Sequence, residues 1–83
     1  MTWMTSPAEL QDYCARLAQT NIVFLDTEFL RETTYFAQLC VIQAKIPGQD
    51  PVAIDALAPD LDLSPFWAAL QNPAILKVFH AGR

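Results

Sequence analysis

The sequence is short of positive charge, with five lysine and arginine residues against nine acidic ones and a net charge of −4. Phosphate affinity usually comes from a basic surface, so charge alone argues against a nucleic-acid-binding protein. The two cysteines, Cys14 and Cys40, have neither the number nor the spacing of a disulfide framework or a zinc site. Both fall among apolar neighbours, and we expect buried, reduced thiols.

The sequence also shows no targeting segment and no membrane-spanning segment. The first residues lack a charged segment followed by an apolar one, which argues against a signal peptide. No apolar run approaches the length of a membrane-spanning helix. We therefore expect a soluble, cytoplasmic protein.

What the chain does have is apolar material: 53% of its 83 residues are hydrophobic and 17% are charged. This composition is typical of a globular protein and not of a disordered tail. A chain of this length has a poor surface-to-volume ratio, so its apolar strands are expected to be incompletely covered. We expect the beginning of a larger domain, with an exposed apolar surface that invites self-association.

The most informative stretch is residues 22–29, in which four apolar residues run directly into two carboxylates, Asp26 and Glu28. The unbroken apolar run predicts a strand covered on both faces. Since residues i and i+2 of a strand point to the same face, both carboxylates are expected side by side. Such carboxylates repel unless a cation lies between them, and Mg²⁺ or Mn²⁺ prefers oxygen ligands. The stretch predicts a divalent-metal site; the alternative is that the two acids simply begin a loop.

A helix is predicted before this strand. Ser6, Pro7 and Glu9 provide a cap, a first-turn proline and a capping box. Apolar residues then recur at three- and four-residue steps as far as Ala18, which indicates one face of an amphipathic helix.

Short connections follow the strand. Residues 30–34 predict a turn, and residues 35–45 predict a second strand with an apolar centre. A turn at residues 46–50 leads to a third strand at residues 51–55, expected at a sheet edge because Pro51 has no N–H to donate. Such connections favour three antiparallel strands in a meander.

The last third of the chain predicts a second helix and a fourth strand. Ser64 and Pro65 repeat the cap-then-proline pattern and start a short apolar helix. Residues 74–79 predict a strand, which should run parallel to a neighbour because it is reached through a helix. The predicted fold class is therefore α/β: a helix, three antiparallel strands, a second helix and a parallel strand.

Four stretches stand in a recognisable order: residues 24–29 with Asp-x-Glu, residues 34–43, residues 54–55, and residues 77–82 with His-Ala-Gly. Together they resemble the start of a DEDD-type 3′→5′ exonuclease, and most of all ribonuclease D. The resemblance implies a ribonuclease H-like fold, here partial and truncated before the sheet is complete. It also implies that residues 1–83 are the N-terminal part of the exonuclease domain, with its remainder and helical nucleic-acid-binding domains absent.

The resemblance further implies roles for individual residues. Asp26 and Glu28 would supply two of four carboxylates that bind two Mg²⁺ or Mn²⁺ ions for hydrolysis of phosphodiester bonds. Thr27 and Phe29 would contact the terminal nucleotide of the substrate, although Phe29 could equally be a core aromatic.

His80 and Gln38 complete the predicted substrate-binding residues. At a strand end beside a metal site, His80 could touch the scissile region; a structural hydrogen bond is the alternative. Gln38 enters an apolar strand and could contact substrate or satisfy a local backbone group.

The family's other two metal-binding aspartates and a nearby tyrosine would lie beyond Arg83. We therefore expect these residues alone to be inactive, and the full-length protein to be an exoribonuclease acting on RNA 3′ ends such as tRNA precursors. One alternative is a DNA-directed proofreading exonuclease. Another is a non-catalytic binding or assembly domain, which the acidic balance favours.

Overall fold

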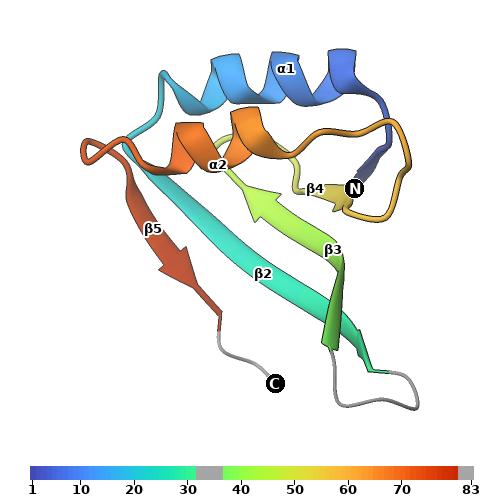
Figure 1. Ribbon diagram of the computed structural model, residues 1–83. Coiled ribbons are helices and arrows are strands. Elements are labelled where there is room, and N and C mark those ends of the chain that lie inside the picture. The colour runs from blue at the N-terminus through green and yellow to red at the C-terminus, as the bar shows by residue number, and fades with distance from the viewer. Residues whose placement is uncertain (32–36, 81–83) are drawn as a thin grey trace.

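The computed structural model describes residues 1–31 and 37–80, and shows a mixed five-stranded sheet with two helices on one face (Figure 1). Across the sheet the strand order is β1-β4-β3-β2-β5. Along the chain the elements are β1 (Thr2–Met4), α1 (Pro7–Leu17), β2 (Ile22–Arg31), β3 (Ala37–Lys45), β4 (Val52–Asp55), α2 (Ser64–Leu70) and β5 (Leu76–Phe79).

The predicted pairing of the strands is confirmed. β2 pairs antiparallel with β3, and β3 pairs antiparallel with β4, which makes the meander. β5, reached through α2, runs parallel to β2. Strand β2 is therefore hydrogen-bonded on both sides, and β5 forms one edge of the sheet.

The first helix begins as its sequence predicts. The Glu9 N–H donates to the Ser6 hydroxyl oxygen at 3.2 Å, and the Ser6 N–H donates to the Glu9 carboxylate at 3.4 Å. This reciprocal capping box satisfies donors that the first helical turn otherwise leaves free. Pro7 fits the first turn because its missing N–H is not needed there.

The second helix begins differently, and the prediction of Ser64 as its cap is wrong. The residue that precedes the helix is Leu63, whose side chain makes no capping hydrogen bond. The Ser64 hydroxyl instead donates to the Asp62 carboxylate at 2.7 Å, while Pro65 lies in the first turn as predicted. Within the residues described, no helix is long and apolar enough to cross a membrane.

The core lies between the two helices and one face of the sheet. Tyr13 of α1 and Phe66 of α2 are both 0% exposed and pack over the strands. In β2, Val23 and Leu25 face this core, and burying an apolar side chain of this size stabilises the fold by about 1.5–3 kcal/mol. The other buried residues of the same cluster are Met4, Leu10, Leu17, Ile42, Ala44, Ile46, Val52, Ile54 and Ile75.

The opposite face of the sheet carries exposed apolar side chains. Phe24, between the buried Val23 and Leu25, is 44% exposed, and Leu76 of β5 is 62% exposed. The predicted cover on both faces of residues 22–25 is thus found on one face only within the described chain. The expectation of exposed apolar surface is confirmed.

The prediction that the third strand forms a sheet edge is wrong. Strand β4 lies between β1 and β3, because the three-residue strand β1 pairs parallel with it. Pro51 does not disturb this pairing, since it precedes β4 and its carbonyl accepts a hydrogen bond from the Thr2 N–H at 3.3 Å. Strand β1 is too short to show a periodic pattern in the sequence.

Two further expectations need adjustment. Strand β2 continues to Arg31, beyond the predicted turn start at residue 30, and the rest of that turn lies outside the described residues together with residues 35 and 36. Cys14 and Cys40 are half-buried instead of buried. Cys14 packs at the margin of the core, where partial burial raises the pKa of its thiol.

Candidate active site

Strand β2 places its two acidic side chains on the open face of the sheet. Val23 and Leu25 are buried beneath the helices, so the alternating positions 24, 26 and 28 face the other side. Asp26 is half-buried and Glu28 is exposed. Thr27, between them, has the parity of the helix-covered face and is half-buried.

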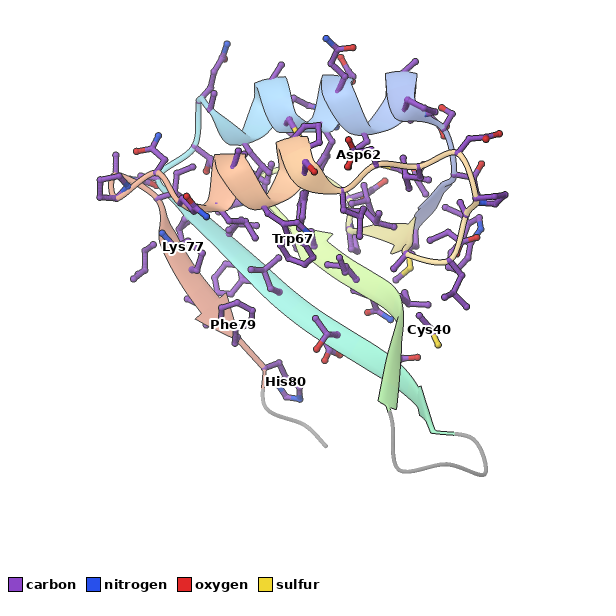
Figure 2. The ribbon with its side chains drawn as sticks, viewed as in Figure 1. Cys40, Asp62, Trp67, Lys77, Phe79 and His80 are labelled. Atoms are coloured by element: carbon purple, nitrogen blue, oxygen red, sulfur yellow. The ribbon has the colours of Figure 1, made fainter. Side chains whose placement is uncertain are left out.

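The neighbouring strands bring two more polar side chains beside Asp26. In the antiparallel pairing of β2 with β3, Gln43 lies directly opposite Asp26. On the other side, Leu25 pairs with Phe79, and the His80 N–H donates to the Leu25 carbonyl at 2.8 Å. Figure 2 shows the His80 ring just beyond the end of β5.

An open cavity of about 380 Å³ lies on this face of the sheet. Its lining is apolar toward the β5 edge and polar around Asp26. The side chains that matter for the site are Phe24, Asp26, Gln43, Lys45, Val78 and His80.

The two carboxylates lack a basic partner within residues 1–31 and 37–80, where the ion pair found joins Arg16 and Asp12 of α1 at 3.2 Å. Lys45 lines the same cavity as Asp26, but its amine donates to the Gln49 carbonyl at 2.7 Å. Asp26 and Glu28 therefore add negative charge to one face without a cation from the described protein beside them. Such a pair is suited to a bound cation.

The donor set fits a hard divalent cation in kind, because Mg²⁺ and Mn²⁺ prefer carboxylate oxygens. It is incomplete in number. In the part of the chain that the structure describes, no three histidine, cysteine or acidic side chains come together as a metal-binding group. Water and groups outside this part would have to supply the remaining ligands.

A β-bulge follows the acidic pair. Glu28 pairs with Val41, but the next residue, Phe29, pairs with Leu39, so Cys40 is an extra residue in β3. The Cys40 carbonyl accepts a hydrogen bond from the Ala56 N–H at 2.9 Å. Bulges twist and end regular pairing, and they are common beside active sites.

Of the six predicted site residues, Asp26 and His80 line the same cavity, and Glu28 lies on the same face of β2 as Asp26. Thr27 shares the strand but has the parity of the other face. Phe29 and Gln38 pair with Leu39 and Leu30 across the hairpin beyond the bulge, and their side chains lie outside the described residues.

Sequence reasoning did not single out Gln43 or Lys45, which both line the cavity. A polar residue between two apolar neighbours in a strand was the available signal for Gln43. Its position opposite Asp26 depends on the register of the hairpin, which the sequence does not reveal.

The whole chain, residues 1–83, matches the family described as 3′-5′ exonuclease. Ribonuclease D of Nitrobacter hamburgensis is 52% identical over 83 residues, which is 100% of this chain and 22% of the relative. The chain belongs to the 3′-5′ exonuclease family, and among its members it is similar to ribonuclease D.

Solved structures agree with this assignment. The crystal structure of Escherichia coli RNase D, described as an exoribonuclease involved in structured RNA processing, matches with a TM-score of 0.85 and 37% identity. It covers 98% of this chain, which in turn covers 21% of that protein. The catalytic core of RRP6 from Trypanosoma brucei shares the fold at a TM-score of 0.87 with 22% identity. The match covers 96% of this chain and 22% of that one.

These matches confirm the predicted fold as part of the ribonuclease D and RRP6 exonuclease fold, which is ribonuclease H-like. The chain spans about a fifth of the length of its ribonuclease D relatives. Metal use is implied by membership of the exonuclease family.

Proposed function

We propose that this chain is the N-terminal part of the exonuclease domain of a 3′–5′ exoribonuclease, in which Asp26 and Glu28 hold divalent metal ions. The observation that carries the proposal is the carboxylate pair on one face of β2, without a basic partner in the described chain. Family membership supports the reaction, and the exoribonuclease description of the Escherichia coli relative supports RNA as the substrate.

The two carboxylates have different surroundings and would act differently. Asp26 lines the cavity between Gln43 and the end of β5, and by family resemblance it would be the carboxylate shared by the two ions. Glu28 is exposed and would hold the ion that activates water. Bound ions of this kind lower the pKa of water and stabilise a leaving oxygen.

The remaining predicted residues would position the substrate. His80, beside the Asp26 strand, can donate a hydrogen bond to a phosphate oxygen. Thr27, between the two carboxylates, would meet the terminal nucleotide through its backbone. Phe29 follows Glu28 and would pack on the nucleotide with its ring, and Gln38 lies across the hairpin.

The net charge of −4 does not oppose this assignment once metals are bound, because they are the largest local charges at such a site. Basic groups for the RNA backbone would come from the part of the protein that this chain does not span. The substrate class we propose is the 3′ end of RNA, such as that of a tRNA precursor.

Metal binding by the 83-residue chain is the first test. Titration with Mn²⁺, followed by paramagnetic broadening of backbone amide signals in NMR spectra, should broaden residues 25–29 and His80 first. The variants Asp26→Asn and Glu28→Gln should each raise the dissociation constant about tenfold or more, since even outer-shell partners contribute that much. Asp60→Asn, which removes an exposed carboxylate from a distant loop, is the matched control and should bind like the parent chain.

Activity is the second test, made on the protein at the full length of its relatives. It should shorten 5′-labelled RNA one nucleotide at a time from the 3′ end when Mg²⁺ or Mn²⁺ is present, and Asp26→Asn should abolish this. DNA of the same sequence should be a poor substrate; preferential cleavage of DNA would replace the RNA assignment by a proofreading one. The isolated 83 residues should be inactive, and metal-dependent RNA degradation by them would contradict the proposed division of the site.

A further inference from the structure

Gln43 is the residue that faces Asp26 across the β2–β3 pairing. It lies in β3 directly opposite Asp26, and side chains in such cross-strand pairs have Cβ atoms about 4.5–5.5 Å apart. Its neighbours Ile42 and Ala44 are each 1% exposed beneath the helices, so Gln43 faces the open side. Both Gln43 and Asp26 line the cavity.

Within the part of the chain that the structure describes, no hydrogen-bond partner explains the polar side chain at position 43. It is half-buried, and among residues 1–31 and 37–80 its amide makes no hydrogen bond. A polar side chain between two buried apolar residues of a strand contributes little to folding when its amide is unbonded. The group is therefore available to a neighbour in the cavity.

The chemistry of an amide suits the position next to a metal-binding carboxylate. A lysine or arginine opposite Asp26 would neutralise its charge and repel an incoming cation. A glutamine amide donates N–H bonds without carrying charge, so it can fix the orientation of one carboxylate oxygen while the other binds metal. Donors of this kind outside the first ligands tune metal sites by 10–100-fold in affinity or activity, as an order of magnitude.

We infer that Gln43 is a positioning residue for Asp26, donating from its side-chain amide to the Asp26 carboxylate when a divalent ion is bound. This inference rests on the proposed function, because it requires metal at Asp26. Other polar side chains of the cavity are less suited to this role, because Lys45 donates to the Gln49 carbonyl and His80 is exposed at the end of β5.

The direct test follows the side-chain amide signals of ¹⁵N-labelled chain during a Mg²⁺ titration by NMR. The Gln43 side-chain protons should shift downfield and saturate at the same Mg²⁺ concentration as the backbone signals of Asp26 and Glu28. The side-chain signal of Gln11, an exposed glutamine on α1, is the internal control and should not move. A purely structural Gln43 would give no such Mg²⁺-dependent shift.

Substitution gives an independent measurement. Gln43→Met keeps the length of the side chain and removes its donors, and it should raise the Mg²⁺ dissociation constant about tenfold with an unchanged melting temperature. Gln11→Met is the matched control and should leave the dissociation constant unchanged. In the full-length protein, Gln43→Met should lower kcat for RNA with little change in KM.

The possible outcomes separate the two proposals. If Asp26 and Glu28 signals do not respond to Mg²⁺ in the parent chain, the proposed metal function fails and the role of Gln43 falls with it. If they respond while the Gln43 side-chain signal stays fixed, or if Gln43→Met binds Mg²⁺ as tightly as the parent, the positioning role alone is overturned.

Discussion

Removing the hydroxyl of Tyr13 should stabilise this protein. Tyr13 of α1 is 0% exposed, and its hydroxyl oxygen is buried without a hydrogen-bond partner in the described structure. Its ring is also in contact with the Arg16 guanidinium, whose carbon lies 4.9 Å from the ring centroid. Tyr13→Phe keeps the ring, its packing and this cation–π contact, and removes only the unsatisfied group.

The size of the effect follows from the cost of a buried polar group. An unsatisfied buried donor or acceptor costs about 1–3 kcal/mol, and we expect a gain near the low end, about 1 kcal/mol in the free energy of unfolding. For a domain of this size, about 1 kcal/mol corresponds to a rise in melting temperature of roughly 4–8 °C.

Because Tyr13 is buried, we also expect the free energy of unfolding to depend on pH in the alkaline range. Burial raises the pKa of Tyr13 to about 12, although the nearby charge of Arg16 lowers it in part. The unfolded chain has a tyrosine pKa of about 10, so above this pH the unfolded state loses its proton first. The contribution of protonated Tyr13 to the free energy of unfolding is therefore complete below about pH 10, and it is lost as the pH rises toward about 12. At pH 11 the loss amounts to about 1.4 kcal/mol in the parent and is absent in Tyr13→Phe.

Urea unfolding of the two chains, followed by circular dichroism at pH 7 and at pH 11, measures both effects. All other residues are the same in both chains, so their contributions cancel in the comparison. The stability difference should be about 1 kcal/mol at pH 7 and wider by about 1.4 kcal/mol at pH 11. A Tyr13→Phe chain that is less stable than the parent at pH 7 would refute the reasoning, because it would show that the hydroxyl is hydrogen-bonded.

Two further predictions concern the first helix and the open sheet face. Ser6→Ala removes the acceptor of the capping box and should lower the free energy of unfolding by about 1 kcal/mol, measured by urea unfolding, whereas Ser6→Asp should restore most of it. The exposed apolar side chains at the β5 edge should make the isolated chain associate at high concentration, as measured by sedimentation velocity. Val78→Lys should reduce this association, while Ala8→Lys on the exposed side of α1 should not; association unchanged by Val78→Lys would place the contact elsewhere.

Local signals in the sequence predicted most elements correctly. The capping box at Ser6 and Glu9 requires only neighbouring residues, so it could be read directly and is confirmed. The spacing of Asp26 and Glu28 likewise fixes that both lie on one face of whatever strand they form. The short connections indicated the antiparallel meander, because a crossover would need more residues.

The predictions were wrong where an element pairs with a strand far away in the sequence, or where a side chain has a second possible hydrogen-bond partner. The sequence suggested a sheet edge at Pro51 because proline has no N–H to donate to a neighbouring strand. In the structure, the three-residue strand β1, from the start of the chain, pairs with β4 on that side. Ser64 matched a capping pattern, yet its hydroxyl donates to Asp62 at 2.7 Å and the helix begins one residue earlier than a Ser64 cap would require.

The sequence by itself determined that this chain forms a strand with two carboxylates on one face, preceded by a capped helix. Periodicity, capping and the repulsion between neighbouring charges act over a few residues, and so they are visible in the order of amino acids. Only the tertiary structure decided that Gln43 lies opposite Asp26, that His80 follows on the other side, and that Lys45 is held by Gln49. Those placements depend on strand register and sheet order, which are set by packing across the whole core.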